Sequence, residues 1–324
     1  MSALLVLLAI VVALAAALGL WRLLLARLAG GVVVLVCIAS FSFLMLKLAP
    51  GGPFDAERSL PAETQRNLER RYNLNLPVAQ QYLLYMGALV RGDLGHSMKR
   101  NQSVKEIIDE SFGVSVRVGL LALVFATAFG IALGVFAASR QNTWWDHGAM
   151  AFALFGISVP SFVLGPLLIM VFSLQLGWLP PARIDGLETY LLPAATLGLI
   201  FMGVIARLAR SGLLETLRQD YIRTARAKGL SERQVVWKHA VRLGLMPVVT
   251  YLGPATAALI TGSFVVEKIF QIPGLGFYFV ASITDRDDPV LTGVLVFYAV
   301  FLVALNLIVD IAYGILDPRI RDKR

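Results

Sequence analysis

The sequence predicts an all-α integral membrane protein, and its composition is the main reason. Of 324 residues, 57% are apolar and only 15% are charged, whereas an ordinary soluble domain carries about 25% charged residues. The mean hydropathy is +0.73, and the apolar residues fall in long runs. A helix needs about 20 apolar residues to cross roughly 30 Å of hydrocarbon. The single cysteine, Cys37, lies inside such a run and excludes a disulfide framework or a cysteine metal site.

Six apolar segments are long enough to be membrane spans. They lie at about 28–46, 113–138, 148–174, 190–206, 248–266 and 290–311. Pro160 and Pro166 in the third segment and Pro254 in the fifth predict helices that bend or break. Small residues recur every fourth position of the second segment and predict a close contact with another helix. These residues are Ala122, Ala126, Gly130, Gly134 and Ala138.

The distribution of charge predicts the orientation of the spans. Nine basic and three acidic residues lie between Arg207 and Arg242, whereas 51–112 holds eight of each. An excess of Lys and Arg is typical of a cytoplasmic loop. Arg22, Arg27 and the basic tail 316–324 agree with a cytoplasmic location, which leaves 51–112 outside. Closely flanking spans argue against a nucleic-acid-binding patch.

Residues 3–20 form a further apolar run with no charge before it. Three interpretations stay open for it. It is an extra span entering from outside, a cleaved signal peptide that lacks the usual basic start, or an upstream extension without a role. We favour the extra span because it keeps Arg22 and Arg27 cytoplasmic.

Charged residues near the spans do not predict an ion pathway. Arg117, Glu267, Lys268 and Asp310 are all expected near an interface, where long side chains reach water. A proton-coupled carrier is therefore disfavoured. The spans contain mainly hydroxyl side chains, among which Ser158, Thr256, Thr261 and Ser263 are candidates to line a translocation path. Hydrogen bonding between helices is an equally good explanation for these hydroxyls.

Motifs for catalysis or for cofactor binding are missing from the sequence. His96, His147 and His239 lie in three different segments, so paired histidines for haem or zinc are not expected. The chain has no Gly-x-x-x-x-Gly-Lys-Ser/Thr phosphate loop and no Gly-x-Ser-x-Gly elbow. We therefore expect a non-catalytic chain that binds no cofactor or metal.

The loop between the fourth and fifth segments, 207–247, is the most informative part of the chain. Tyr221, Ile222 and Ala225 are spaced to share one helix face. Gly229 is expected to end that helix in a left-handed conformation. Ser231 and Gln234 have the spacing of a capping box that starts a second helix. Exposed apolar and basic faces would then suit a cleft in a soluble partner, although a basic loop on anionic lipid remains an alternative.

This loop resembles the coupling motif of ABC-importer permeases, which reads Glu-Ala-Ala, three residues, Gly, nine residues, Ile-x-Leu-Pro. Gly229 and Ala225 match, Arg223 and Thr224 replace Glu and Ala, and Pro247 comes five residues late. These departures look like the peptide/nickel branch, whose loop commonly reads Ile-Arg-Thr-Ala-Arg-Ala-Lys-Gly-Leu, as 222–230 does.

Further segments extend the resemblance over about 20–324 and leave 1–19 outside it. These segments are 48–51, 91–95, 272–276 and 316–319. The segment 53–61 looks most like the oligopeptide permeases of this branch. The resemblance implies a type I importer bundle of six core transmembrane helices, with one extra N-terminal helix possible. It divides the chain into a lead-in 1–27, a first core span 28–49, an external segment 50–112, a permease domain 113–315 and a tail 316–324.

The resemblance also implies a mechanism and a set of partners. The chain would pair with a second homologous permease in a bacterial inner membrane, surrounded by lipid. Two cytoplasmic ATPases would bind ATP and Mg, and an extracytoplasmic binding protein would deliver short peptides. The residues implied to couple ATP hydrolysis to transport are Tyr221, Ile222, Arg223, Thr224, Ala225, Arg226, Lys228, Gly229 and Leu230.

Two alternatives to peptide import by an ABC transporter stay open. The same family also suggests dipeptides, nickel, glutathione or a siderophore as cargo. A channel or secondary carrier that works alone would transport without an ATPase, and the coupling loop argues against it.

Overall fold

The computed structural model describes residues 21–49, 63, 72–182, 186–262 and 264–316. Within these ranges the regular elements are helices, and the single β-bridge joins His96 to Ser103. Five helices are long and apolar enough to cross a membrane, or six when one bent pair counts as a single span. This confirms the predicted all-α membrane class. The run 3–20 lies outside the described residues.

The chain divides into two compact units, which are described separately here. Unit 1 comprises 1–113 and 274–324, and unit 2 comprises 114–273. Helix α5 (Val104–Ser139) belongs to both, because its first turns lie in unit 1 and the rest in unit 2. This helix begins nine residues before the start of the predicted second span at 113.

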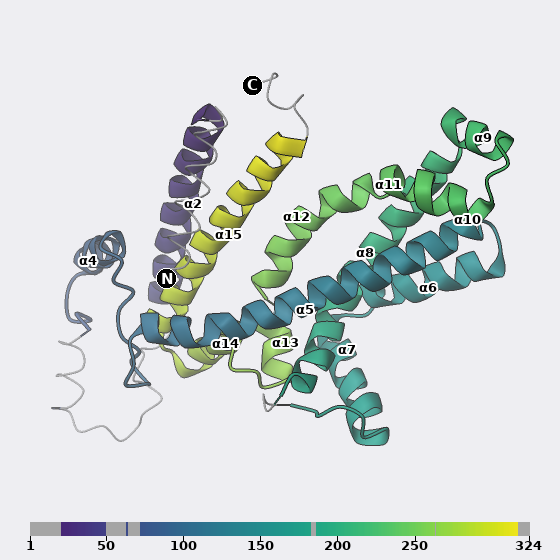
Figure 1. Ribbon diagram of the computed structural model, residues 1–324. Coiled ribbons are helices and arrows are strands. Elements are labelled where there is room, and N and C mark those ends of the chain that lie inside the picture. The colour runs from purple at the N-terminus through teal and green to yellow at the C-terminus, as the bar shows by residue number, and fades with distance from the viewer. Residues whose placement is uncertain (1–20, 50–62, 64–71, 183–185, 263, 317–324) are drawn as a thin grey trace. The chain divides into compact units, whose positions relative to one another are not determined.

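Unit 1 is built on two long antiparallel helices that lie side by side, α2 (Trp21–Leu48) and α15 (Asp288–Leu316) (Figure 1). Their contact is close because Gly31 leaves room for Val303. An ion pair between Arg27 and Asp310, 2.9 Å between Nε and Oδ2, joins the same two helices. Asp310 is therefore paired with a basic residue of the neighbouring helix.

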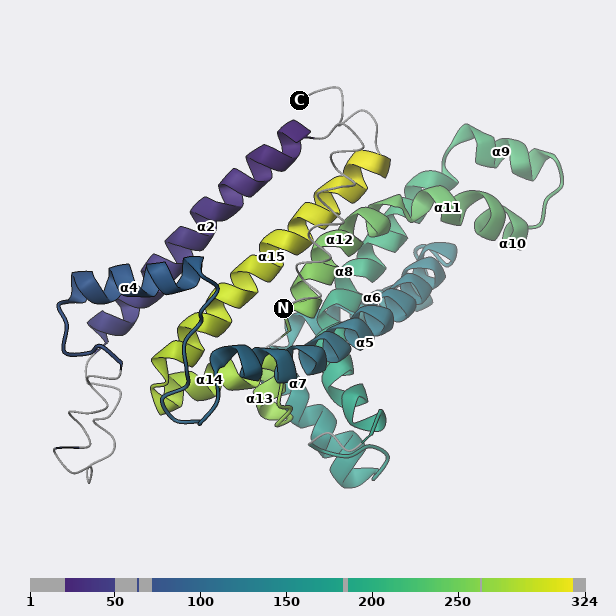
Figure 2. The ribbon, with the colours of Figure 1, turned by 60° about the vertical axis from the view of Figure 1, so that its left-hand side comes forward.

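Two shorter helices complete unit 1. Helix α4 (Val78–Val90) crosses one end of α2, and the Tyr82 and Tyr85 rings each lie 5.5 Å from the Phe43 ring (Figure 2). Helix α14 (Leu275–Asp285) ends at Arg286, which has a left-handed φ of 53°. The adjacent Asp287 is buried and accepts hydrogen bonds from the Ser97 hydroxyl and the Met98 N–H.

In unit 2 the predicted third span is a broken pair of helices. Helix α6 (Trp144–Ser158) is followed by α7 (Ser161–Leu168), which continues as a π-helix, η1 (Ile169–Gln175). The direction of the helix axis changes by 110° at the break between the two arms. Pro160 explains the break, since it lacks an N–H and forces the preceding residue away from helical geometry. Val159 is accordingly extended, with φ −95° and ψ 123°.

Helix α8 (Leu191–Leu217) is the centre of unit 2 and is preceded by a short 3₁₀ turn, η2 (Glu188–Tyr190). It runs 11 residues beyond the predicted end at Ala206, so Arg207 and Arg210 lie on the helix and not in a loop. The predicted span ends at Ala206 because it is defined by apolar residues, and Arg207 comes next.

Small residues let α5, α6 and α8 approach closely. A methyl group added at Gly156 of α6 would lie 2.5 Å from the Leu199 carbonyl oxygen of α8. One added at Gly134 of α5 would lie 2.5 Å from the Ala206 carbonyl oxygen. Ala126 of α5 is fully buried. The predicted close contact along the second span is therefore confirmed, and its partner is α8.

The predicted fifth span is also interrupted. Helix α12 (Met246–Ile260) contains Pro254 without ending there, and α13 (Phe264–Ile269) follows. Between them Gly262 has a φ of 80°, a conformation that glycine adopts without strain. The sequence predicts an interruption at Pro254, but the helix continues through this proline and ends near Gly262.

Candidate functional site

The candidate coupling loop begins with helix α9 (Asp220–Ala227), directly after α8. Its apolar side chains face the protein itself, because Ile222 is fully buried and Ala225 is 6% exposed. They pack in one cluster with Val135 and Ala138 of α5. The expectation of an exposed apolar face for docking is therefore wrong for these two residues. Their burial anchors α9 to the end of α5.

Helix α9 ends in a Schellman motif at Gly229. The Leu230 N–H donates to the Ala225 carbonyl over 3.4 Å, and the Gly229 N–H donates to the Arg226 carbonyl over 2.9 Å. These two bonds satisfy carbonyl groups that the last helical turn leaves unpaired. Gly229 has the left-handed φ of 78° that the motif requires. The prediction of a glycine-terminated helix is confirmed.

A second short helix, α10 (Glu232–Gln234), starts with the predicted capping box. The Ser231 side chain accepts from the Gln234 N–H, and the Gln234 side-chain oxygen accepts from the Ser231 N–H over 3.2 Å. The chain continues as a π-helix, η3 (Val235–Ala240), and α11 (Val241–Gly244) before α12. The loop is therefore a compact helical hairpin.

An ion pair ties the two arms of this hairpin together. The Arg226 guanidinium donates to Glu232 through Nε at 2.7 Å and through its second nitrogen at 3.3 Å. These hydrogen bonds raise the pKa of Arg226 above its usual range, so the guanidinium stays charged. Because Arg226 is occupied in this way, it has fewer donors left for a partner.

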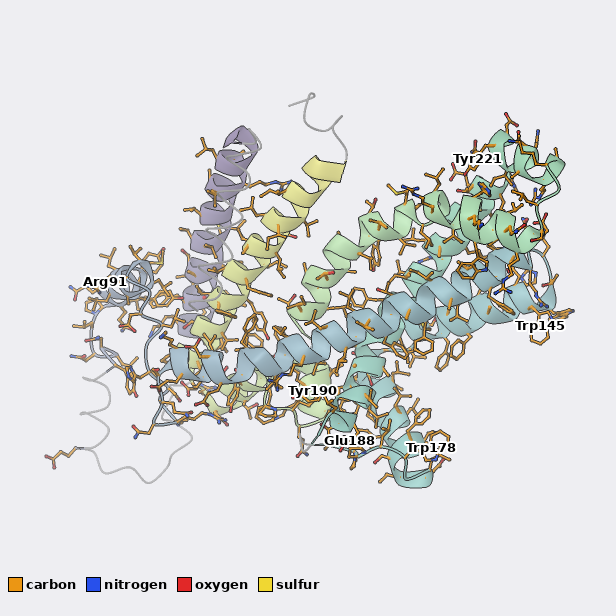
Figure 3. The ribbon with its side chains drawn as sticks, viewed as in Figure 1. Arg91, Trp145, Trp178, Glu188, Tyr190 and Tyr221 are labelled. Atoms are coloured by element: carbon orange, nitrogen blue, oxygen red, sulfur yellow. The ribbon has the colours of Figure 1, made fainter. Side chains whose placement is uncertain are left out.

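The outward face of α9 is polar and basic. Tyr221 is 39% exposed and the Arg223 side chain is 75% exposed. Thr224 and Lys228 are also exposed. Tyr221 therefore does not share the buried face of Ile222 and Ala225, contrary to the spacing argument. Figure 3 shows both Tyr221 and Trp145, which lies at the start of α6, at the outer end of unit 2.

A buried ion pair holds the start of α6 against α8. Asp146 is 1% exposed and accepts from Arg210 Nε at 2.6 Å and from the second guanidinium nitrogen at 2.7 Å. It also accepts from the Asn142 N–H at 2.9 Å. Thr143 caps α6 through the Asp146 N–H. The sequence interpretation missed this pair, because the Thr143–Asp146 spacing indicates the helix cap and not the partner Arg210.

The candidate path hydroxyls bond to their own helices. The Ser158 hydroxyl donates to the Leu154 carbonyl at 3.1 Å, and that of Thr256 donates to the Leu252 carbonyl at 2.6 Å. The Thr261 hydroxyl donates to the Ala257 carbonyl. Ser263 lies outside the described residues. These bonds use the hydroxyl protons, so each of the three side chains keeps only oxygen lone pairs for any further hydrogen bond.

The expectation that Glu267 reaches water is wrong, because this residue is only 1% exposed. It is the fourth residue of α13, and its carboxyl group lies against Gly262 at the break between α12 and α13. Arg117 is exposed on α5, as predicted. Within the described ranges, no three His, Cys, Asp or Glu side chains are grouped so that they could hold a metal ion.

Comparison with known proteins identifies what this arrangement is similar to. Residues 130–322 match the family described as binding-protein-dependent transport system inner membrane component. The chain is 46% identical over 288 residues to the dipeptide transport system permease protein DppB of Bacillus subtilis (strain 168), covering 89% of this chain and 94% of that protein.

Other relatives and one solved structure agree. The chain is 42% identical to the oligopeptide transport system permease protein OppB of Haemophilus influenzae, over 91% of this chain and 97% of that protein. It is 40% identical to OppB of Escherichia coli (strain K12), over 89% and 95% respectively. A crystal structure of an amino acid ABC transporter with histidines matches with a TM-score of 0.51 at 15% identity. That match covers 64% of this chain and 93% of the other, and shows the fold alone.

Proposed function

The chain belongs to the family of binding-protein-dependent transport system inner membrane components, and we propose that it is the permease of an ATP-driven importer of short peptides. The relatives named as oligopeptide and dipeptide permeases support this cargo, because the chain aligns with nearly their whole length. As a permease it forms a conduit and carries out no chemical reaction. ATP and Mg are bound by partner ATPases.

The proposed partners follow from the same membership. A second homologous permease completes the pathway, two ATPases bind on the cytoplasmic side, and an extracytoplasmic binding protein delivers the peptide. We propose that the basic loop, the N-terminal side of the core and the C-terminal tail are cytoplasmic, because cytoplasmic segments are rich in Lys and Arg. The external segment 50–112 is then the landing surface for the binding protein.

The observation that carries the coupling role is the construction of α9. Its inner residues, Ile222 and Ala225, are buried, so α9 is fixed to the end of α5. Its outer residues, including Tyr221 and Arg223, are exposed, and three of them are basic against one acid, Asp220. An ATPase that grips this outer face would move α9 together with the spans that it is fixed to. Lys228, Gly229 and Leu230 close the helix and set the direction in which the chain leaves it.

The hydroxyl groups of Thr256 and Thr261 are compatible with a peptide path. An extended peptide carries backbone N–H groups, and hydroxyl oxygens can accept from them loosely. Ser158 and Ser263 are proposed for the same role. Loose acceptors suit cargo of variable sequence.

Gly229→Val tests the coupling role in the assembled transporter. A β-branched residue is strained at a φ of 78°, although the space around Gly229 is open. We expect ATP hydrolysis to continue while peptide uptake into proteoliposomes falls at least tenfold. Gly229→Asn should retain most uptake, because asparagine tolerates the left-handed conformation.

Gly148→Val is the matched control, since Gly148 lies in α6 with nothing within 4 Å and no positive φ. It should leave uptake unchanged. Unchanged uptake by Gly229→Val would remove the coupling role. Uptake by this chain without any ATPase would instead support a lone channel or secondary carrier. Competition with dipeptides, longer peptides, nickel and glutathione assigns the cargo.

A further inference from the structure

A cavity of about 880 Å³ lies in unit 2, where α5 and α8 end next to α10 and η3. Its wall is apolar on one side, formed by Ala132 and Phe136 of α5, Leu214 of α8, and Val236 and Trp237 of η3. Ligand-binding cavities in proteins commonly have volumes of about 300–1,000 Å³. This cavity is large enough for part of a lipid molecule.

Four arginines line the same cavity: Arg140, Arg218, Arg226 and Arg233. The single acidic residue in the lining, Glu232, is already bound to Arg226. Among the described residues, no carboxylate forms an ion pair with any of the other three. The Arg140 guanidinium instead lies 5.4 Å from the centre of the Phe136 ring. The cavity therefore carries three positive charges that lack a counterion from this part of the chain.

The cavity lies beside the ends of two long helices. Helix α5 ends at Ser139 and helix α8 ends at Leu217, and the next residues are Arg140 and Arg218. Trp237 of the cavity lining is 60% exposed. Trp145, which Figure 3 shows at the outer end of unit 2, is 63% exposed. Tryptophan is enriched where hydrocarbon meets water. In this cavity an apolar wall lies next to guanidinium groups. In a phospholipid the acyl chains lie next to the phosphate in the same way.

We propose that this cavity binds one anionic phospholipid. The head-group phosphate lies among Arg140, Arg218 and Arg233, and the upper acyl chains run along Phe136 and Trp237. Guanidinium groups pair with phosphate in a bidentate manner, and basic pockets between spans on the cytoplasmic side are suited to anionic head groups. A soluble anion would leave the apolar wall uncovered. The site goes beyond the peptide-import role, and its cytoplasmic location rests on the orientation proposed above.

Quenching of Trp237 by brominated lipids tests this site directly. The chain has five tryptophans, so replacing Trp21, Trp144, Trp145 and Trp178 by phenylalanine leaves Trp237 as the only one. The purified full chain is placed in nanodiscs of phosphatidylcholine that contain brominated phosphatidylglycerol or brominated phosphatidylcholine. Each arginine near an anionic head group contributes about fivefold in affinity. With the three arginines engaged, phosphatidylglycerol should quench with an apparent affinity about 100-fold higher than phosphatidylcholine.

A triple substitution and its charge-matched control separate this site from a general charge effect. Arg140→Gln, Arg218→Gln and Arg233→Gln together should abolish the preference for phosphatidylglycerol. Arg223→Gln, Lys228→Gln and Lys238→Gln remove the same charge from exposed positions outside the cavity and should retain it. Equal quenching by the two lipids, or a preference that survives the first triple variant, would overturn the proposal. Circular dichroism verifies that each variant is folded.

Soluble anions provide the last arm of the test. If glycerol 1-phosphate or inorganic phosphate removed the excess quenching at millimolar concentration, the cavity would be assigned to a soluble phosphate and the lipid proposal would fail. Persistence of the quenching supports the lipid. This assay needs no ATPase and no peptide, so its outcome is independent of the uptake experiment.

Discussion

Asp146→Asn removes one charge of the ion pair between α6 and α8 while keeping the size of the side chain. The carboxylate is 1% exposed and binds Arg210 through two short hydrogen bonds, at 2.6 Å and 2.7 Å. Removal of one member of a buried ion pair typically costs about 3–5 kcal/mol, because the remaining charge is left without a partner.

The accessibility of Arg210 lowers the expected cost. Its side chain is 27% exposed, so water can hydrate part of the guanidinium after the substitution. We therefore expect Asp146→Asn to lower the free energy of unfolding by about 2–3 kcal/mol. Arg210→Gln should cost more, about 3–5 kcal/mol, since it leaves the more deeply buried carboxylate unpaired. The double variant should be less destabilised, by about 1.5–3 kcal/mol, than the sum of the losses in the two single variants.

The measurement is unfolding of the purified chain in mixed micelles by titration with dodecyl sulfate, followed by circular dichroism. Asp220→Asn is the control, because its partner Arg223 is 3.4 Å away and both side chains are mostly exposed, at 96% and 75%. An exposed pair of this kind contributes less than about 0.5 kcal/mol. Additive effects of the two single substitutions at Asp146 and Arg210 would refute the reasoning.

Three further predictions use other parts of unit 2. Gly156→Ala should destabilise the chain by about 1–3 kcal/mol in the same titration, because the new methyl group would lie 2.5 Å from a backbone oxygen of α8. Gly148→Ala should stabilise the chain by about 0.5–1 kcal/mol, because the space around Gly148 is open. If Gly148→Ala were the more destabilising of the two substitutions, the packing described would be wrong. Ile222→Ala should remove about 2–4 kcal/mol of local stability, seen as faster tryptic cleavage within α9, and an unchanged rate would mean that α9 is not anchored there. Ser231→Ala should cost about 1 kcal/mol of local stability at the start of α10, because the capping hydrogen bond is lost. The hydrogen exchange of the Gln234 amide should become roughly fivefold faster. An unchanged exchange rate would mean that the cap does not stabilise this helix.

Features set by short stretches of sequence could be predicted well. Long apolar runs identified the spans, because the hydrocarbon thickness sets a minimum length. Gly229 and the Ser231–Gln234 cap depend on backbone geometry within four residues, and both are present as predicted. Small residues at every fourth position of α5 indicated a close helix contact, although they could not name α8 as the partner.

Features that depend on distant residues could not be predicted. Asp146 and Arg210 are 64 positions apart, so nothing in either local sequence indicates that they pair. Glu267 follows an apolar run and is expected at an interface, yet the turn at Gly262 places it inside unit 2. Tyr221 and Ile222 are neighbours that differ in burial because the end of α5 covers only one side of α9.

The same limit applies to the arginine-lined cavity. Arg140 and Arg218 each follow the end of a span, which a count of charges assigns to a cytoplasmic loop. Their position around one cavity arises from the parallel ends of α5 and α8 and from the fold of the loop. A charge count records how many cations face one side of the membrane but not whether they converge.

The continuous helix α8 also restricts how the length of this chain can change. Each residue added to a helix turns everything beyond it by about 100° and shifts it by about 1.5 Å. An insertion or deletion between η2 and α9 would therefore rotate the anchored face of α9 away from α5 and carry Arg210 away from Asp146. Substitutions can accumulate along α8 without this effect. We expect natural variants to differ in the length of their external segments while the number of residues from Leu191 to Gly229 stays constant.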